Sequence, residues 1–361
     1  MRALVSGYYG FDNAGDEAIL AGLVEGFRAA EPAVELTVLS GNPEATRAEH
    51  GVAAAPRGFS SARARLRETD LFISGGGGLI QDATSWRSPL YYLGLIWLAR
   101  RAGVPIACLG QSVGPVRRRW VRGLARRGFN RARVLAVRDR RSAEMVRSLG
   151  VSREIHVTGD LALLLPPPGP ADCERAWRKA ALAATGEPTA AIAVRRLPQE
   201  DRGRGREIGQ AAVAACRAAE LRPVLVPMQR PQDVELAEQV ARAMHVGEVV
   251  HAPLTARETL ALIGGFDLVI AMRLHALIMA AVCGRPLVGI SYDPKVDGLM
   301  GELGLPLAAT AREFSAEQVR AAVEETWRTR EQVTAHLAAR VERVRAQARA
   351  NIDLARQALS P

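Results

Sequence analysis

The chain has 361 residues, of which 48% are hydrophobic and 24% charged, and its formal net charge is +10. Single cores stop growing near roughly 250 to 300 residues, so this length predicts two domains. No apolar run approaches the roughly 20 residues that cross a bilayer, and the N-terminus carries no secretory signal pattern, which excludes a membrane-spanning chain and predicts a cytoplasmic protein.

Apolar runs of strand length alternate with helical periodicity from the first residue onward, which is typical of parallel sheets covered by helices. Strands are predicted at residues 3–6, 36–39, 71–74, 105–110, 134–137 and 155–158. Helices fill most of the gaps, with clear examples at residues 16–30, 89–102 and 141–149.

A proline-rich stretch at residues 165–170 can continue neither a helix nor a central strand, so it marks a linker. A second alternating series follows, with strands predicted at residues 190–194, 223–226, 248–250, 268–271 and 287–290. Capping boxes begin at Thr255 and Ser315. We predict an α/β fold of two Rossmann-like, doubly wound domains facing across a cleft: an N-terminal domain at 1–165, a linker at 166–175, a C-terminal domain at 176–315 and a helical segment at 316–361.

Two glycine-rich loops follow predicted strands. The stretch GYYGFDNAGDEAIL begins at Gly7, and four glycines run from Gly75 to Gly78. Glycines at a strand-to-helix turn let the backbone approach a ligand, although tight turns alone also explain them. The first loop is not GxGxxG, and Ser40-Gly41-Asn42 stands where a dinucleotide fold places an acidic ribose ligand, which disfavours a dehydrogenase.

The most informative stretch is DLVIAMRLHALIMAAVCGRPLVGISYDPK, which begins at Asp267. A strand at 268–271 and a helix at 274–282 place Arg273 and His275 at a strand-to-helix turn. A cation at a helix N-terminus opposes the helix dipole and destabilises the fold by roughly 0.3 to 1 kcal/mol, unless an anion lies between the cation and the helix end. The position of Arg273 therefore predicts a bound phosphate or carboxylate. His275 could exchange a proton near neutral pH. The alternative is a histidine that caps its own helix beside an arginine paired with an internal carboxylate.

Other polar groups follow neighbouring strands. Arg195 and Arg196 follow the strand at 190–194, Lys295 follows the strand at 287–290, and Gln229 and Arg230 with Asp233 follow the strand at 223–226. These strand ends should meet at one edge of a sheet. Several basic groups with one histidine and no metal-ligand spacing indicate a small polyanion whose chemistry is proton transfer.

An ordered set of motifs resembles the polysaccharide pyruvyl transferase family, in particular CsaB-type enzymes that pyruvylate secondary cell-wall polymers used in S-layer anchoring. The set is GYYGFDNAGDEAIL, SGGGGLIQD, GQSVGP, AVRDRRSAEMVRSLGV, VPMQRPQD, MRLHALIMA and SYDPKV, and it covers most of the chain. The resemblance implies a GT-B-like fold and pyruvyl transfer from phosphoenolpyruvate to two acceptor hydroxyls. One departure is TGDLALLL, where a TADP-like segment is expected; it affects the geometry of the linker.

The resemblance matches Arg195, Arg273, Leu274 and His275 to positions that bind phosphoenolpyruvate and catalyse transfer. We interpret His275 as the acid or base and Arg273 as its catalytic partner, with Lys295 beside the anion. The expected acceptor is a lipid-diphosphate-linked ManNAc-GlcNAc that takes a 4,6-ketal on ManNAc. Neither a cofactor nor a metal is expected. The residues predicted to bind the acceptor are Asn13, Asp16, Glu17, Gly76, Gly77, Gln81 and Asp82.

The segment 116–134 carries Trp120, Leu124 and Phe129 among many arginines. It could rest on an anionic cytoplasmic leaflet, and an ordinary solvated helix explains it equally well. Two rival functions remain open. A GT-B glycosyltransferase would present an acidic residue to a nucleotide ribose, and a nucleic-acid-binding protein would interleave basic residues with aromatics, which make up only 5% of this chain.

Overall fold

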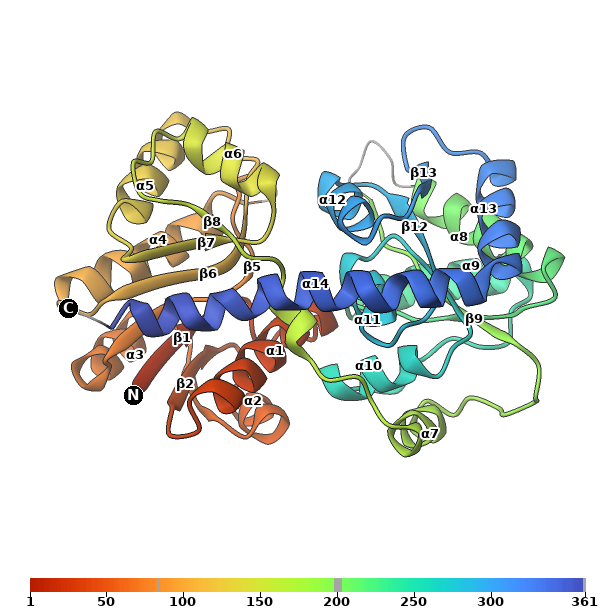
Figure 1. Cartoon of the computed structure of the whole chain (residues 1–361), viewed down its shortest axis with the longest axis horizontal. Coiled ribbons are helices and arrows are strands. Elements are labelled where there is room, and N and C mark those ends of the chain that lie inside the picture. The colour runs from red at the N-terminus through yellow and green to blue at the C-terminus, as the bar shows by residue number, and fades with distance from the viewer. Residues whose placement is uncertain (84, 198–202, 360–361) are drawn as a thin grey trace. The chain divides into compact units, whose positions relative to one another are not determined.

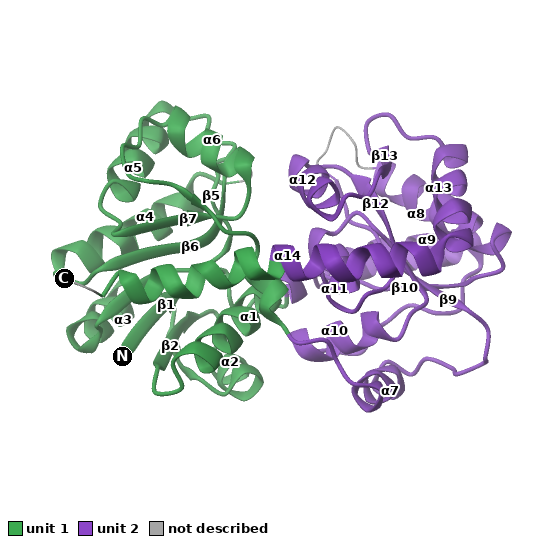
Figure 2. Cartoon of the chain, viewed as in Figure 1, with its two compact units in different colours: residues 1–12, 16–165, 345–361 green, residues 13–15, 166–344 purple. Residues whose placement is uncertain are grey.

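The computed structural model describes residues 1–83, 85–197 and 203–359, which form the two compact units coloured in Figure 2. Unit 1 comprises Met1–Asp12, Asp16–Leu165 and the chain from Arg345 onward. Unit 2 comprises Asn13–Gly15 and Pro166–Val344. Figure 1 labels the elements of both units.

Unit 1 is built on a parallel sheet in the strand order β3-β2-β1-β4-β6-β7-β8, with β5 paired to β6. The run of crossovers outward from β1 in both directions is typical of a doubly wound Rossmann-like sheet. The strands are β1 (Arg2–Ser6), β2 (Glu35–Ser40), β3 (Ala53–Pro56), β4 (Leu71–Ser74), β5 (Gly77–Ile80), β6 (Ile106–Val113), β7 (Val134–Val137) and β8 (His156–Val157).

The helices of unit 1 cover this sheet and bury apolar side chains against it. They are α1 (Ala14–Ala30), α2 (Pro43–His50), α3 (Phe59–Arg65), α4 (Arg87–Arg101), α5 (Arg119–Phe129) and α6 (Arg140–Ser148), with short 3₁₀ turns η1 (Leu66–Glu68) and η2 (Leu161–Leu164).

Unit 2 has a second parallel sheet in the order β10-β9-β11-β12-β13. Its strands are β9 (Thr189–Ala193), β10 (Arg222–Leu225), β11 (Leu268–Ala271), β12 (Leu287–Ser291) and β13 (Leu307–Thr310). Its helices are α7 (Pro170–Lys179), α8 (Arg204–Ala218), α9 (Gln232–Met244), α10 (Ala256–Gly264), α11 (Leu274–Val282), α12 (Pro294–Leu303) and α13 (Ala316–Arg328), followed by α14 (Arg330–Gln357).

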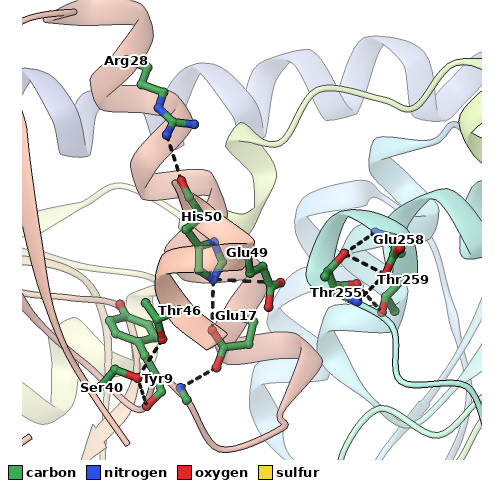
Figure 3. A network of polar contacts seen from close by, with 11 residues as sticks. Tyr9, Glu17, Arg28, Ser40, Thr46, Glu49, His50, Thr255, Glu258 and Thr259 are labelled. Atoms are coloured by element: carbon green, nitrogen blue, oxygen red, sulfur yellow. Dashed lines mark hydrogen bonds and ion pairs between the residues drawn. The ribbon is translucent and has the colours of Figure 1, made fainter. Parts of the chain in front are cut away.

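Local sequence signals account for several of these boundaries. The strand at 268–271 and the helix at 274–282 are confirmed at both ends. Both predicted capping boxes form. In each, the hydroxyl of the first residue accepts from the backbone N–H three residues later, and the side chain of that later residue accepts from the backbone N–H of the first. Figure 3 shows this arrangement for Thr255 and Glu258. These signals involve residues within a few positions of one another, so they can be recognised without knowledge of the fold.

Three predictions about elements differ from the structure. The strand expected at 248–250 is wrong, because only one bridge, Leu225 to Val249, forms there. Strands β3 and β5 were missed because their sequences, AAAP and GGLI, consist mainly of alanine, proline and glycine, which are depleted in strands. The glycine run therefore contributes its last two members to a strand.

The domain ends also differ in detail from the sequence analysis. Helix α7 begins at Pro170, inside the expected linker, because proline suits a first helical turn. The C-terminal segment breaks into α13 and α14 at Thr329, and from Arg345 onward it belongs to unit 1. Asn351 is fully buried there and accepts a hydrogen bond from Thr158 at 2.8 Å, and such distant pairing has no local signature.

Candidate functional site

The carboxyl ends of four neighbouring strands of unit 2 gather most of the predicted donor-binding residues. Arg195 follows β9, Arg273 follows β11, and Tyr292 and Lys295 follow β12. Asp233 lies in the first turn of α9, which follows β10. Because ligands of open α/β sheets bind outside the carboxyl ends of the strands, this edge is the candidate site.

Tyr292 lies at the centre of the positive charges. Arg195 donates from Nη1 to the Tyr292 hydroxyl at 2.6 Å, and its guanidinium lies 4.4 Å from the ring centroid. The ammonium of Lys295 lies 5.5 Å from the same centroid. Burial raises the pKa of Tyr292, but the charges of Lys295, Arg195 and Arg273 lower it by more, so the pKa lies below the usual value for tyrosine.

Sequence reasoning did not single out Tyr292. The stretch SYDPK shows that a tyrosine follows the strand, yet a lone tyrosine after a strand has no distinctive spacing. Only the pairing of strands β9, β11 and β12 reveals that it contacts both Arg195 and Lys295. A phenol held among three cations is an anion-attracting centre.

Arg273 already has an anionic partner inside unit 2. Its Nη2 donates to Gln229 Oε1 at 3.2 Å and contacts Asp233 Oδ1 in an ion pair with a fully buried carboxylate. Asp233 therefore supplies the negative charge that the sequence analysis expects from a ligand. Both contacts use Nη2, and the buried Nε has no hydrogen-bond partner within the described part of the chain. Donor capacity thus remains on this side chain.

His275 is the second residue of α11 and is half-buried. Leu274, the first residue of the same helix, is buried in the core. The imidazole lies directly against Gly15: a Cβ on Gly15 would overlap His275 Nδ1 and fall 2.7 Å from its Cγ. Gly15 therefore leaves the space that the ring occupies.

The residues Asn13–Gly15 group with unit 2 rather than with the N-terminal domain in which the sequence analysis places them. The amide of Ala14 donates to the Met228 carbonyl at 3.0 Å, and Asn13 forms an antiparallel bridge with Gln229. Asn13 Oδ1 accepts from the Gly15 amide at 3.1 Å. The start of α1 thus lies beside the residues that hold Arg273.

The glycines of unit 1 are explained in large part by close packing. A Cβ on Gly7 or Gly75 would overlap the ring or hydroxyl of buried Tyr9, and one on Gly76 would lie 2.9 Å from Ile19 Cγ2. Gly77 has a positive φ of 95°, and a Cβ there would lie 2.8 Å from Asp16 Oδ1. Of the predicted acceptor residues, Gly77 and Asp16 are thus brought together.

Glu17 serves an internal network that Figure 3 shows. Its carboxylate accepts from the Gly10 amide at 2.7 Å and lies 3.2 Å from His50 Nε2. Glu49 lies 3.9 Å from the same nitrogen. Within the described residues, Glu17, Glu49 and His50 are close enough to hold a metal ion, but hydrogen bonding between Glu17 and His50 already accounts for the arrangement.

Asp82 is also used internally. Its two carboxylate oxygens accept from the amides of Arg117 and Arg118 at 2.8 and 2.7 Å, and its side chain is fully buried. Burial raises the pKa of Asp82, but these backbone bonds and the two arginine charges lower it by more. Gln81 Oε1 accepts from the Ala83 amide at 2.9 Å. These groups shape the loop after β5.

Two Rossmann-like units with parallel sheets define the GT-B type of architecture, and solved structures of that type match this chain. It is similar to the S. aureus MnaA-UDP co-structure, with 13% identity, coverage of 94% and 91% of the two chains and a TM-score of 0.64. A glycosyltransferase from Rickettsia africae is 9% identical, with coverage of 99% and 98% and a TM-score of 0.64. At these identities the likeness concerns the fold.

The sequence matches the family model described as polysaccharide pyruvyl transferase over residues 13–294, and the chain belongs to this family. It is 27% identical over 267 residues to the amylovoran biosynthesis protein AmsJ of Erwinia amylovora. That alignment covers 68% of this chain and 62% of the relative, so the chain spans less than two thirds of the relative's length.

Proposed function

We propose that this chain moves the pyruvyl group of phosphoenolpyruvate onto two hydroxyls of a cell-surface polysaccharide precursor. The observation that carries the proposal is the convergence of Arg195, Arg273 and Lys295 around Tyr292, on the helix-entry edge that also presents His275. Phosphoenolpyruvate carries a phosphate and a carboxylate together, which accounts for several cations at one edge. The family match favours pyruvyl transfer over other chemistry of a small polyanion.

In the proposed reaction, His275 acts as the acid or base in one proton transfer. Protonation of the methylene carbon of phosphoenolpyruvate leaves an oxocarbenium-like C2, which one sugar hydroxyl attacks with loss of its proton. The C2–O bond to phosphate then breaks, and a neighbouring hydroxyl attacks C2 and loses its proton, which closes the ketal. Arg195 and Lys295 hold the anionic groups of the donor, and Asp233 orients Arg273 for the same role.

For the acceptor we propose a lipid-diphosphate-linked ManNAc-GlcNAc, with a 4,6-ketal formed on ManNAc, as in CsaB-type enzymes. Asn13, Asp16 and Gly77 are the acceptor candidates that remain after Glu17, Gln81 and Asp82 are assigned to internal hydrogen bonds and Gly76 to close packing. Leu274 contributes the start of α11 rather than a side-chain contact, because its side chain is buried in the core.

The proposal is tested with phosphoenolpyruvate and the lipid-linked disaccharide. Phosphate release should accompany a product heavier by one pyruvate ketal, which mass spectrometry identifies. The competing glycosyltransferase function is tested in a parallel reaction with UDP-GlcNAc. Release of UDP with a lengthened saccharide, and no ketal in the first reaction, would overturn the proposal.

Tyr292→Phe should raise the KM for phosphoenolpyruvate about 10-fold while kcat stays within about 3-fold, since the lost hydrogen bond to Arg195 involves a charged donor and acts on ground-state binding. The difference between the ultraviolet titration curves of the wild type and of this variant should show one tyrosine whose pKa lies below the usual range. Bound phosphoenolpyruvate should raise that pKa, because it adds negative charge. Tyr91→Phe, whose buried hydroxyl has no hydrogen-bond partner within the described residues, is the matched control. Identical titrations with and without donor would contradict the assignment.

A further inference from the structure

A groove of about 630 Å³ runs between α4 and α5 in unit 1, two helices that pack against each other and are labelled in Figure 1. Leu90, Leu93 and Trp97 recur along one face of α4, and Leu124 contributes from α5. The spacing of three and four residues places these side chains on a single stripe. The lining is therefore predominantly apolar, although it opens to the surface.

Large aromatic side chains are exposed on the two helices that form this groove and at the start of α4. Trp97 is 57% exposed, Trp120 is 46% exposed and Trp86 is 43% exposed. Trp86 and Trp120 meet edge to face with their ring centroids 6.0 Å apart. Exposed apolar surface of this kind marks an interaction site, and tryptophan is enriched where one face of a side chain is apolar and the other wet.

The charges around the groove are of one sign. The sequence contains no Asp or Glu between Asp82 and Asp139, a stretch that includes both helices. Arg100, Arg127 and Arg131 line the groove. On the other side of Trp97, a more polar hollow of about 810 Å³ is lined in part by Arg63, Arg67 and Arg101. An apolar slot rimmed by arginines complements a molecule with an apolar chain and an anionic head.

We propose that this face of unit 1 binds the surface of an anionic phospholipid bilayer. Trp97, Trp120 and Leu124 enter the interfacial region, one lipid chain occupies the groove, and the arginines contact lipid phosphates. This proposal rests on the proposed function, because a lipid-linked acceptor is the reason for the protein to bind a bilayer surface. Among the described residues, none of the helices combines the length and the apolar character that a bilayer-spanning segment needs.

The structure also changes which residues form this face. From the sequence, only the segment 116–134 is predicted to face a membrane, with Phe129 among the groups that contact it. Phe129 is fully buried in the core of unit 1, and much of the apolar surface comes from α4 instead. Trp120 and Leu124 are exposed as that interpretation requires.

Vesicle sedimentation with the full chain tests the proposal. Wild type should sediment with phosphatidylglycerol vesicles and not with phosphatidylcholine vesicles. The double variant Arg127→Gln, Arg131→Gln should lose roughly 10-fold or more of the partition coefficient, because basic residues near the surface each contribute to anionic-lipid binding. Trp97→Ser with Trp120→Ser should weaken binding by a similar factor and reduce the quenching of protein fluorescence by brominated lipid, with the remaining quenching due to Trp86.

A charge-matched control separates this face from the overall positive charge. Arg206→Gln with Arg312→Gln changes two exposed arginines of unit 2 and should leave vesicle binding unchanged. Equal losses in the two arginine pairs, or no sedimentation of wild type at low salt, would overturn the proposal. Tighter binding of an RNA homopolymer through Arg127 and Arg131, with vesicles unbound, would assign the face to nucleic acid. Melting curves check that the variants fold.

The two proposals fail separately. Vesicle binding is measured without phosphoenolpyruvate and does not depend on turnover. If vesicles are not bound while phosphate is still released with a soluble disaccharide acceptor, only the lipid surface is wrong. If vesicles are bound and no ketal forms, the pyruvyl transfer is wrong and the surface remains.

Discussion

His275→Ala is expected to lower kcat for pyruvyl transfer by about 10²- to 10⁴-fold, the range typical for loss of a general acid or base. The imidazole lies at the start of α11, two residues from Arg273 and one from the buried Leu274, so the backbone fixes its position. Binding of phosphoenolpyruvate, measured by calorimetry, should change little, since Arg195 and Lys295 remain in place. A phosphate-release assay gives kcat.

The control for this variant is His251→Ala, which removes an exposed histidine from the same unit. It should leave both kcat and donor binding unchanged. A kcat within about 3-fold of wild type for the His275 variant would remove the histidine from the mechanism, because a proton-transfer group contributes far more than that. Loss of donor binding together with kcat would instead make His275 a binding residue.

Gly15→Ala should lower kcat by about 10- to 100-fold through displacement of the His275 ring, since a misplacement near 1 Å can cost that much. The added Cβ would overlap Nδ1 and lie 3.0 Å from Cε1, so either the ring or the start of α1 must move. Helix propensity alone predicts that the substitution raises the free energy of unfolding, because alanine is a better helix former than glycine by about 1 kcal/mol. Enzyme assays and thermal melts measure the two effects.

Gly301→Ala is the matched control, because this glycine also lies in a helix, α12, and nothing lies within 4 Å of the Cβ it would gain. It should keep normal activity and melt at the same or a slightly higher temperature. Normal turnover by the Gly15 variant would show that the imidazole does not need the position described here. A similar loss in both variants would point to a general effect of adding methyl groups.

The anion that pairs with Arg273 could not be identified from neighbouring residues in the sequence. From the sequence, a cation at the N-terminus of a helix predicts a nearby anion, because the cation opposes the helix dipole. The structure places Asp233 against it, a residue forty positions earlier in the chain and in the first turn of α9. Which of several anions satisfies a charge depends on strand order, which a linear sequence does not display.

Local patterns in the sequence were sufficient for the alternation of strands and helices, the two capping boxes, the exact span of α11 and the gathering of basic residues after strands of the second sheet. Each of these depends on neighbours within a few residues. The tertiary structure alone decided that Tyr292 sits among the cations, that Gly15 makes room for His275, that Glu17 and Asp82 bond internally, and that Trp97 faces outward. Those facts arise from contacts between residues far apart in the chain, and burial and partner choice there follow from how the strands pair and the helices pack.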